Sequence, residues 1–352
     1  MKKIALVLLV ALIAMGTVFA TGSAEAPKAQ ETMKIAICLG TGGLGDKNFN
    51  DMAYAGLTQA AEDFGITFDY YEPKTVSDYA PALRHFADTE EYALIIGMGS
   101  DMDSTMAEVA VEYPNQKFSL VDTGNTNPPA NLRTVATRWQ EQTFLCGVYA
   151  GLGTLSDMPN ANSANVIGVI LGMDTPVLRN GVTGFITGAR YVNKDVEVLE
   201  AVIGSFNDAP KGKEVAISMF NRGADFIQPI AGACGLGVFN GAKENGFYAF
   251  GVGGNQNHIE PSVVLATSIR NVNEMIYNEV AAVVNGTWKS GYEINGLKEG
   301  AVGYSAEGSG VEVPAEIAAI IEAVKAQVIS GELPMCESYD QIDAWVAAHQ
   351  YK

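Results

Sequence analysis

The sequence predicts an α/β protein with two lobes, each a doubly wound parallel sheet covered by helices on both faces, joined by a hinge of several chain crossings. Three observations predict this fold. Short apolar runs alternate with amphipathic stretches of helical length from Lys34 onward. The alternation restarts near residue 166, after a polar loop. The chain of 352 residues is longer than a single typical core requires and fits two domains.

The first half of the chain supplies the elements of one lobe. Each strand candidate is a continuous apolar run, typical of strands that a parallel sheet buries on both faces. The expected strands are 34–39, 66–71, 93–96 and 118–121, and the expected helices are 49–64, 79–89 and 104–113. Open sheets of this kind bind ligands at the carboxyl ends of their strands.

The second lobe follows a helical crossing segment, 140–154, and a polar loop, 156–165. Its expected strands are 166–171, 196–203, 226–230 and 248–252, and its expected helices are 177–192, 211–222 and 236–245. A late strand, 263–269, and a late helix, 272–285, come too late to start a third domain. We therefore expect them to complete the first lobe. The predicted lobes comprise 33–145 plus 256–298, and 146–255 plus 299–352.

The N-terminal residues predict export. Lys2 and Lys3 precede an apolar run at 4–15, and Val18-Phe19-Ala20 is a small-x-small cleavage signal. We predict a signal peptide at 1–20 and a flexible leader at 21–32, and the alternative is a membrane anchor. The first cysteine is Cys38, so no lipid-anchoring cysteine follows the cleavage site. The expected location is the periplasm or the cell surface.

Charge and cysteine usage exclude several classes of partner and site. Loss of Lys2 and Lys3 with the signal peptide takes the formal charge from −18 to −20. A strongly acidic protein repels polyanions, so we expect no nucleic-acid partner. The four cysteines are too far apart for a zinc ribbon or a C-x-x-C redox site. An oxidising compartment allows disulfides, but buried free thiols are favoured in a chain with large cores.

A glycine-rich loop follows the first expected strand. Residues 40–45 match G-x-G-x-x-G, which is typical of dinucleotide-binding sites. Residues 46–50 intervene before the helical pattern, however, and the loop lacks the G-K-[ST] ending of a phosphate-binding P-loop. The favoured interpretation is that the glycines let the backbone turn tightly where the sheet binds its ligand.

No motif indicates catalysis. His85, His258 and His349 are scattered along the chain, and neither H-E-x-x-H nor G-x-S-x-G occurs. A glycosidase-type pair of carboxylates stays open, because no motif selects a pair among the 40 acidic residues. We expect no catalytic residues, no cofactor and no metal.

Five motifs, taken together and in order, carry a family resemblance: GGLGDKNFN at 42–50, FSLVD at 118–122, GMDTPV at 172–177, GSFND at 204–208 and GLGVF at 235–239. They resemble the basic membrane protein family, the type I periplasmic binding proteins that include the purine nucleoside receptors of ABC transporters. The resemblance runs from about Lys34 to Gly303. It implies a small-molecule solute as ligand, an ABC permease and its ATPase as membrane partners, and a binding protein that is not an enzyme. We expect this protein to be a monomer.

The resemblance also implies a set of binding residues. Phe49 matches the aromatic that stacks on a purine, and Asn50 and Asp122 match the amide and the carboxylate that read the edge of the ring. An aromatic plane suits a flat π-face, an asparagine offers both a donor and an acceptor, and an aspartate accepts from a ring N–H. We expect these three residues on one side of the cleft.

Four further positions are candidate binding residues although this part of the chain departs from the nucleoside-binding pattern, and Gln228, Asn255 and Arg270 are expected to close over the ligand from the opposite side. Gln228 stands where a second stacking phenylalanine is common, and Gly253 where a ribose-binding aspartate is found. Asn255 could restore part of the lost hydrogen bonding, and Arg270 replaces a lysine. The predicted ligand is a purine-like nucleoside or nucleobase. Alternatives are riboflavin or a sugar in the same fold, a sensory role in place of uptake, and an exported nucleoside- or sugar-processing enzyme.

Overall fold

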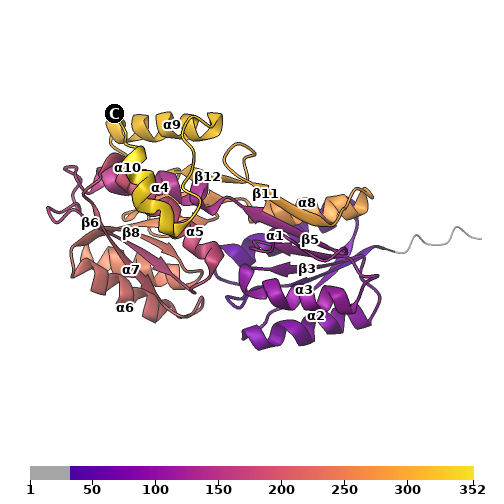
Figure 1. The fold of residues 1–352 in the computed structure, drawn as a ribbon. Helices are drawn as coiled ribbons and strands as arrows, with labels where there is room; N and C mark the ends of the chain where they lie inside the picture. The colour runs from indigo at the N-terminus through magenta and orange to yellow at the C-terminus, as the bar shows by residue number, and fades with distance from the viewer. Residues whose placement is uncertain (1–31) are drawn as a thin grey trace, which may run out of the picture. The chain divides into compact units, whose positions relative to one another are not determined.

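The computed structural model describes residues 32–352. The predicted signal peptide at 1–20 and all but the last residue of the leader at 21–32 lie outside the described residues. The described part contains two six-stranded sheets, each with helices on both faces (Figure 1). This arrangement confirms the predicted α/β fold class.

The first sheet has the strand order β11-β5-β4-β3-β1-β2, and all of its strand pairs are parallel. Its strands are β1 (Lys34–Cys38), β2 (Thr67–Tyr71), β3 (Leu94–Met98), β4 (Phe118–Val121), β5 (Leu132–Thr137) and β11 (Gly291–Asn295). Helices α1 (Phe49–Phe64) and α8 (Val272–Val284) pack on one face, and α2 (Tyr79–Asp88) and α3 (Asp103–Glu112) on the other.

Strand β1 explains why this sheet reads as continuous apolar runs. Successive side chains of a strand point to opposite faces. Ile35 and Ile37 accordingly pack beneath α1 and α8, while Ala36 and Cys38 pack against α2 and α3. Both faces of the strand are therefore covered, and its position in the sequence could be predicted from hydrophobicity alone.

The second sheet has the order β12-β10-β9-β8-β6-β7, with β12 antiparallel to β10 and the other pairs parallel. Its strands are β6 (Val166–Leu171), β7 (Glu197–Val202), β8 (Ala224–Ile230), β9 (Tyr248–Gly253), β10 (Val264–Arg270) and β12 (Val302–Ser305). Helices α6 (Ala209–Phe220) and α7 (Cys234–Asn245) cover one face. Helices α4 (Trp139–Gly153), α5 (Pro176–Val192), α9 (Ala315–Ser330) and α10 (Ile342–Ala348) build the core of the other. The 3₁₀ turns η1 (Val76–Asp78), η2 (Ser100–Met102) and η3 (Tyr339–Gln341) precede α2, α3 and α10.

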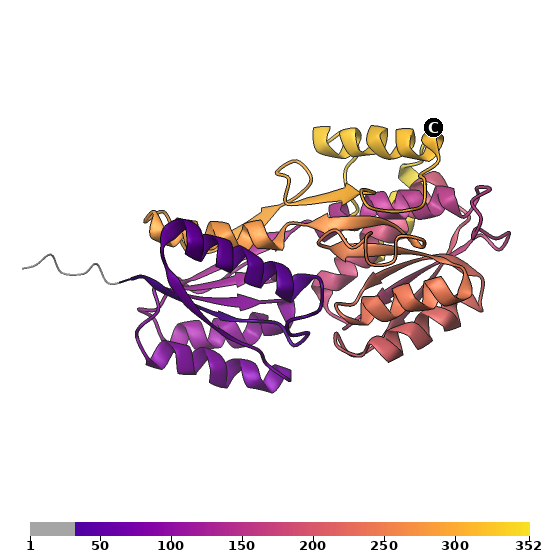
Figure 2. The same cartoon turned by 180° about the vertical axis from the view of Figure 1, so that it is seen from behind.

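The late strand was assigned to the wrong sheet in our prediction. Residues 263–269 were expected to complete the first lobe, but β10 pairs with β9 in the second sheet. The helix that follows it was assigned as predicted, because α8 lies beside α1 on the first sheet in both views (Figure 2). The chain therefore crosses between the sheets after Arg270, not before the strand. Among the described residues it crosses three times, at 137–139, 270–272 and 295–302. The lobe boundaries as a whole stay a prediction.

The four cysteines are buried free thiols, as predicted. Cys38 lies in β1 and Cys146 in α4, and Cys234 begins α7. Burial raises the pKa of each thiol above its ordinary value. The cores of both sheets are thus held together by packing, without a covalent cross-link.

One carboxyl in the second core should make stability depend on pH. Asp225 is fully buried at the start of β8, and burial raises its pKa to about 6. Its Oδ2 accepts hydrogen bonds from Thr154 Oγ1 (3.0 Å) and from the backbone N–H of Asn162 (2.8 Å), while Oδ1 has no partner among the described residues. Folding therefore favours the protonated form, and the cost of ionising this group grows as pH rises from about 4 to 6.

As pH rises from 4 to 7.5, the free energy of unfolding of Asp225→Asn should increase by about 1–3 kcal/mol relative to that of the wild type, because the amide stays neutral while the carboxyl ionises. Urea unfolding at both pH values measures this difference. Asp157→Asn, which removes an exposed carboxylate, is the control for the loss of one charge. If the difference in the free energy of unfolding between Asp225→Asn and the wild type stayed constant with pH, Asp225 would not have a raised pKa in the folded protein.

Candidate ligand-binding site

A pocket lies between the carboxyl ends of the two sheets. Its first wall comes from the loop after β1, the ends of β3 and β4, and the start of α4. Its second wall comes from the loops after β6, β7 and β8 and from the ends of β9 and β10. This is the edge of a doubly wound sheet at which ligands bind, and here two such edges face each other.

Asp46 shapes the loop after β1. This buried carboxylate accepts hydrogen bonds from the backbone N–H groups of Asn48 (2.9 Å), Asn50 (3.0 Å) and Asp51 (3.3 Å). Burial raises the pKa of Asp46, and these backbone hydrogen bonds oppose that rise. The carboxylate takes the place of a helix cap, because it satisfies the free N–H groups at the start of α1.

Asn50 lines the pocket, but its side chain mainly holds the loop together. Its Oδ1 accepts from the backbone N–H of Gly40 (2.8 Å), and its Nδ2 donates to Asp46 Oδ2 (3.1 Å). One N–H of the amide is left over for a ligand. The expected role in reading the edge of a ring is thus reduced to at most one donated hydrogen bond.

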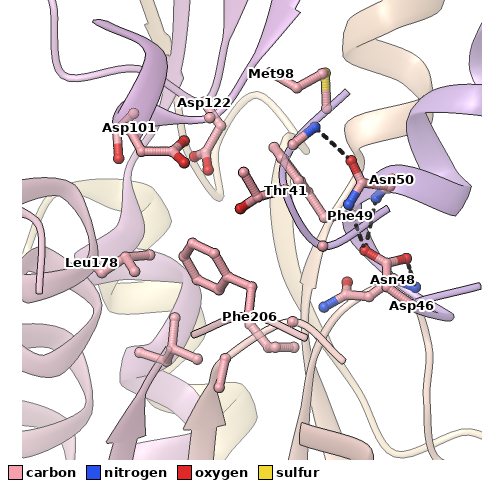
Figure 3. Close-up of a pocket in the computed structure, with 18 of the residues that line it drawn as sticks. Thr41, Asp46, Asn48, Phe49, Asn50, Met98, Asp101, Asp122, Leu178 and Phe206 are labelled. Carbon is pink, nitrogen blue, oxygen red and sulfur yellow. Dashed lines mark hydrogen bonds between the residues drawn. The ribbon is translucent and has the colours of Figure 1, made fainter. Parts of the chain in front are cut away.

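Two phenylalanines line the pocket from opposite walls (Figure 3). Phe49 begins α1, and Phe206 follows β7 in the second half of the chain. Gly172 and Gly232 make room for Phe206, because a Cβ at Gly172 would lie 2.4 Å from its ring and one at Gly232 would lie 3.3 Å from its Cβ. Phe206 was not predicted as a binding residue, because position 228 was taken as the place of the second stacking aromatic. Phe206 lies within the GSFND motif at 204–208, which could have pointed to it.

An ion pair joins the two walls. Arg270, at the end of β10, contacts Asp122, which follows β4, and both side chains are almost fully buried. Trp139 Nε1 donates to the same Asp122 oxygen (2.9 Å). The Arg270 guanidinium carbon lies 4.2 Å from the centre of the Trp139 ring and 5.0 Å from the centre of the Phe49 ring. Both are cation–π distances. Arg270 Nη1 is the atom that contacts Asp122, and Arg270 Nε makes no hydrogen bond among residues 32–352. Trp139 was not predicted.

Three predicted residues do not line this pocket. Gln228 is buried within the second sheet, where its Nε2 donates to the carbonyls of Pro229 (2.9 Å) and Gly251 (3.3 Å). Asn255 donates to the carbonyl of Glu307 (3.0 Å) instead. Gly253 lies against the side chain of Asn48, and Asn48 lines the pocket. The structure therefore brings together Phe49, Asn50, Asp122 and Arg270, with the last on the opposite wall as expected; Gln228 and Asn255 are engaged elsewhere.

The charge of the pocket disfavours anions. Among the described lining residues, Asp46, Asp101 and Asp122 are acidic and Arg270 is the single cation. Burial raises the pKa of Asp101, which accepts a hydrogen bond from the Tyr79 hydroxyl (2.7 Å). A carboxylate or phosphate ligand would thus meet more negative than positive groups, whereas a neutral ligand would not.

Further contacts connect the walls around the pocket. Gln256 Nε2 donates to the carbonyl of Lys47 (3.3 Å), and the hydroxyls of Ser100 and Thr175 lie 3.4 Å apart. These contacts join loops that follow strands of the first sheet to loops that follow strands of the second. They are the kind of contact that a closed cleft makes.

Comparison with known proteins identifies the family. Residues 34–331 match the family model described as ABC transporter substrate-binding protein PnrA-like. The chain belongs to this Bmp family. The resemblance of the five sequence motifs is thereby confirmed, as is the periplasmic binding protein fold.

Individual relatives match this Bmp family protein over most of its length. An uncharacterised lipoprotein of Pyrococcus furiosus is 32% identical over 316 residues, which cover 86% of this chain and 78% of that protein. The ABC transporter nucleoside-binding protein BmpA of Lactococcus lactis is 26% identical over 333 residues, covering 88% and 91%. A solved ABC transporter solute-binding protein of Aeropyrum pernix has a TM-score of 0.81 at 25% identity, covering 90% and 98%.

Membership of the Bmp family fixes the general role. The chain is a solute-binding protein of an ABC transporter, from an extracytoplasmic family whose members take small-molecule ligands to a membrane permease. Within residues 32–352, no helix combines the length and the apolar character that crossing a membrane requires.

Proposed function

We propose that this protein captures a planar, largely neutral heterocycle, a purine-like nucleoside or nucleobase, between Phe49 and Phe206. The observation that carries the proposal is that these two aromatic side chains line one pocket from opposite sheets. Aromatic faces on both sides suit a flat ring, and stacking of this kind tolerates any base. The acidic balance of the pocket favours a ligand without negative charge. The name of the Lactococcus lactis relative, a nucleoside-binding protein, agrees with this ligand class.

The proposed mechanism is capture by closure. A ligand that contacts both walls adds to the contacts Gln256–Lys47, Ser100–Thr175 and Asp122–Arg270, and so shifts the population towards the closed state. The exported, monomeric protein then presents the closed form to an ABC permease with its ATPase. Turnover of the ligand is not part of the mechanism.

Calorimetry and thermal unfolding of residues 21–352 test the proposal. The panel contains adenosine, guanosine and inosine, their free bases, riboflavin and glucose. We expect saturable binding of at least one purine compound and a higher melting temperature in its presence, because a ligand that binds only the folded state stabilises it. Mass spectrometry after incubation should return the compound unchanged. Binding of riboflavin or glucose alone, binding of nothing, or release of a free base from a nucleoside would each overturn the proposal.

A further inference from the structure

The first two crossings between the sheets are each one residue long. Arg138 separates the end of β5 from the start of α4, and Asn271 separates the end of β10 from the start of α8. Their backbones have similar dihedral angles, with φ −76° and ψ 84° for Arg138 and φ −83° and ψ 65° for Asn271. Because the connections are so short, a rotation of one sheet against the other must change the dihedral angles at these positions.

The third crossing, which follows β11, is hydrogen-bonded to both of the others. The carbonyl of Asn295 accepts from the backbone N–H of Arg138 (2.9 Å). The carbonyls of Gly300 and Ala301 accept from Asn271, the first from its side-chain amide (2.8 Å) and the second from its backbone N–H (3.0 Å). Within residues 32–352, every connection between the two sheets passes through these three crossings, and we refer to them as the hinge.

Two carboxylates hold the backbone on either side of Gly296, the first residue after β11. Glu299 Oε2 accepts a hydrogen bond from the N–H of Gly296 (2.8 Å), and Glu141 Oε2 accepts one from the N–H of Leu297 (2.7 Å). These N–H groups belong to the two peptide planes that flank Gly296, and the φ and ψ of a residue set how its two flanking planes are oriented. The carboxylates therefore fix the conformation of a residue that would otherwise turn freely.

Gly296 also makes room for this arrangement. A Cβ at Gly296 would lie 2.1 Å from Glu141 Oε2 and 2.7 Å from Arg138 Cδ. Glu141 Oε1 lies 3.6 Å from Arg138 Nε. The Glu141 carboxylate thus contacts the first crossing through Arg138 and the third through Leu297. Glu141 and Glu299 both lie outside the residues that line the ligand pocket.

The contacts of Glu141 occur together with those that join the walls of the ligand pocket. They are therefore contacts of the closed cleft. A rotation at Arg138 or Gly296 moves the groups that Glu141 holds, so opening the cleft disturbs these contacts. We propose that Glu141 is a positioning residue of the hinge, which stabilises the closed form and so tightens ligand binding from outside the pocket.

The test has one arm that needs no ligand and one that rests on the proposed function. Small-angle X-ray scattering of residues 21–352 without ligand measures the radius of gyration, which rises as the cleft opens. Calorimetry and stopped-flow dissociation, with the tightest purine compound of the panel, measure the affinity and the dissociation rate. Melting temperatures without ligand check that each variant folds.

The variants are Glu141→Ala, the conservative Glu141→Gln and the matched control Glu274→Ala. Glu274 lies in the first turn of α8, as Glu141 lies in the first turn of α4, and each helix directly follows a crossing of the hinge. The side chain of Glu274, however, is exposed. Gly296→Ala gives a second route to the same change, because its Cβ displaces the Glu141 carboxylate, and it provides the test if Glu141→Ala does not fold.

We expect Glu141→Ala to enlarge the radius of gyration of the ligand-free protein and to weaken ligand binding about threefold to tenfold, the scale of one hydrogen bond. The loss should come from faster dissociation, because the contact belongs to the closed form, and the association rate should change less than about twofold. Glu141→Gln should retain most of the affinity, since its amide oxygen can accept from Leu297. Glu274→Ala should match the wild type in every measurement. Gly296→Ala should add little in the Glu141→Ala background, because both changes remove the same contact.

The outcomes separate this inference from the proposed function. If Glu141→Ala has the radius of gyration and the dissociation rate of the wild type, the inference is overturned even where the melting temperature falls, because the residue then supports only the fold. Equal changes in Glu274→Ala would overturn it as well, since they would reflect the loss of any carboxylate near the hinge. If no purine compound binds, the proposed function fails, and the scattering arm alone decides the inference.

Discussion

Replacing Arg270 by leucine should lower the free energy of unfolding by about 3–5 kcal/mol, because the change leaves Asp122 buried without its cation. The two side chains are only 5% and 8% exposed, so solvent screens the pair weakly. The guanidinium also lies over the rings of Trp139 and Phe49, and these contacts disappear with it. Urea unfolding of the ligand-free protein measures the effect.

Two further variants separate the charge from the loss of packing. Asp122 has a φ of 67°, a conformation that asparagine tolerates, so Asp122→Asn removes the charge with little backbone strain. The double variant with Arg270→Leu should recover about 2 kcal/mol or more over Arg270→Leu alone, because no buried charge remains. Arg84→Leu, at an exposed ion pair with Glu112, should cost less than about 1 kcal/mol. A similarly small loss for Arg270→Leu would mean that the pair does not form in the ligand-free protein.

Phe49→Ala should weaken binding of the purine ligand by about 1–3 kcal/mol, the scale of a base stacked on an aromatic side chain. Phe206→Ala should have an effect of the same size, because the ring meets the pocket from the other wall. Calorimetry with the tightest purine compound of the panel measures both. Phe49 also packs beside the core of the first sheet, so unfolding of each variant is measured in parallel.

Two substitutions serve as controls for this result. Phe49→Leu keeps an apolar side chain but removes the π-face, and should lose much of the affinity that Phe49→Ala loses. Phe64→Ala removes a ring at the far end of the same helix, where it contacts Tyr277 and not the pocket, and should leave the affinity unchanged. Unchanged affinity in Phe49→Ala would remove this residue from the site.

Most strands could be predicted from the sequence, including the edge strands β2 and β7, whereas β5, β11 and β12 were missed. Strands such as β1 and β6 are buried on both faces, so their hydrophobic runs locate them without knowledge of their neighbours. Strand β11, with the sequence GYEIN, is half-exposed, and it was missed because no apolar run marks it. Strand β10 was found but placed in the wrong sheet. Its pairing with β9 depends on the point at which the chain crosses, which periodicity does not report.

Four predicted residues line the pocket: Phe49 and Asn50 near one loop, and Asp122 and Arg270, each at or directly after the end of a strand. Phe49 and Asn50 follow a glycine-rich turn that marks the carboxyl end of β1. Gln228 was predicted to face the ligand, but it lies within β8, and its side chain bonds to neighbouring backbone of the sheet. Phe206 and Trp139 reach the pocket from segments far apart in the sequence. Their meeting is a property of how the two sheets face each other.

The unbridged cysteines have a practical consequence for following domain motion. Thiols that are buried and hard to ionise react slowly with maleimides and other thiolate-directed reagents. A cysteine engineered onto the surface of each half would then be labelled selectively without deleting the native four. A fluorophore pair attached in this way could report the distance across the cleft as solutes are added, on a chain that can be produced in a reducing cytoplasm because its fold needs no oxidant.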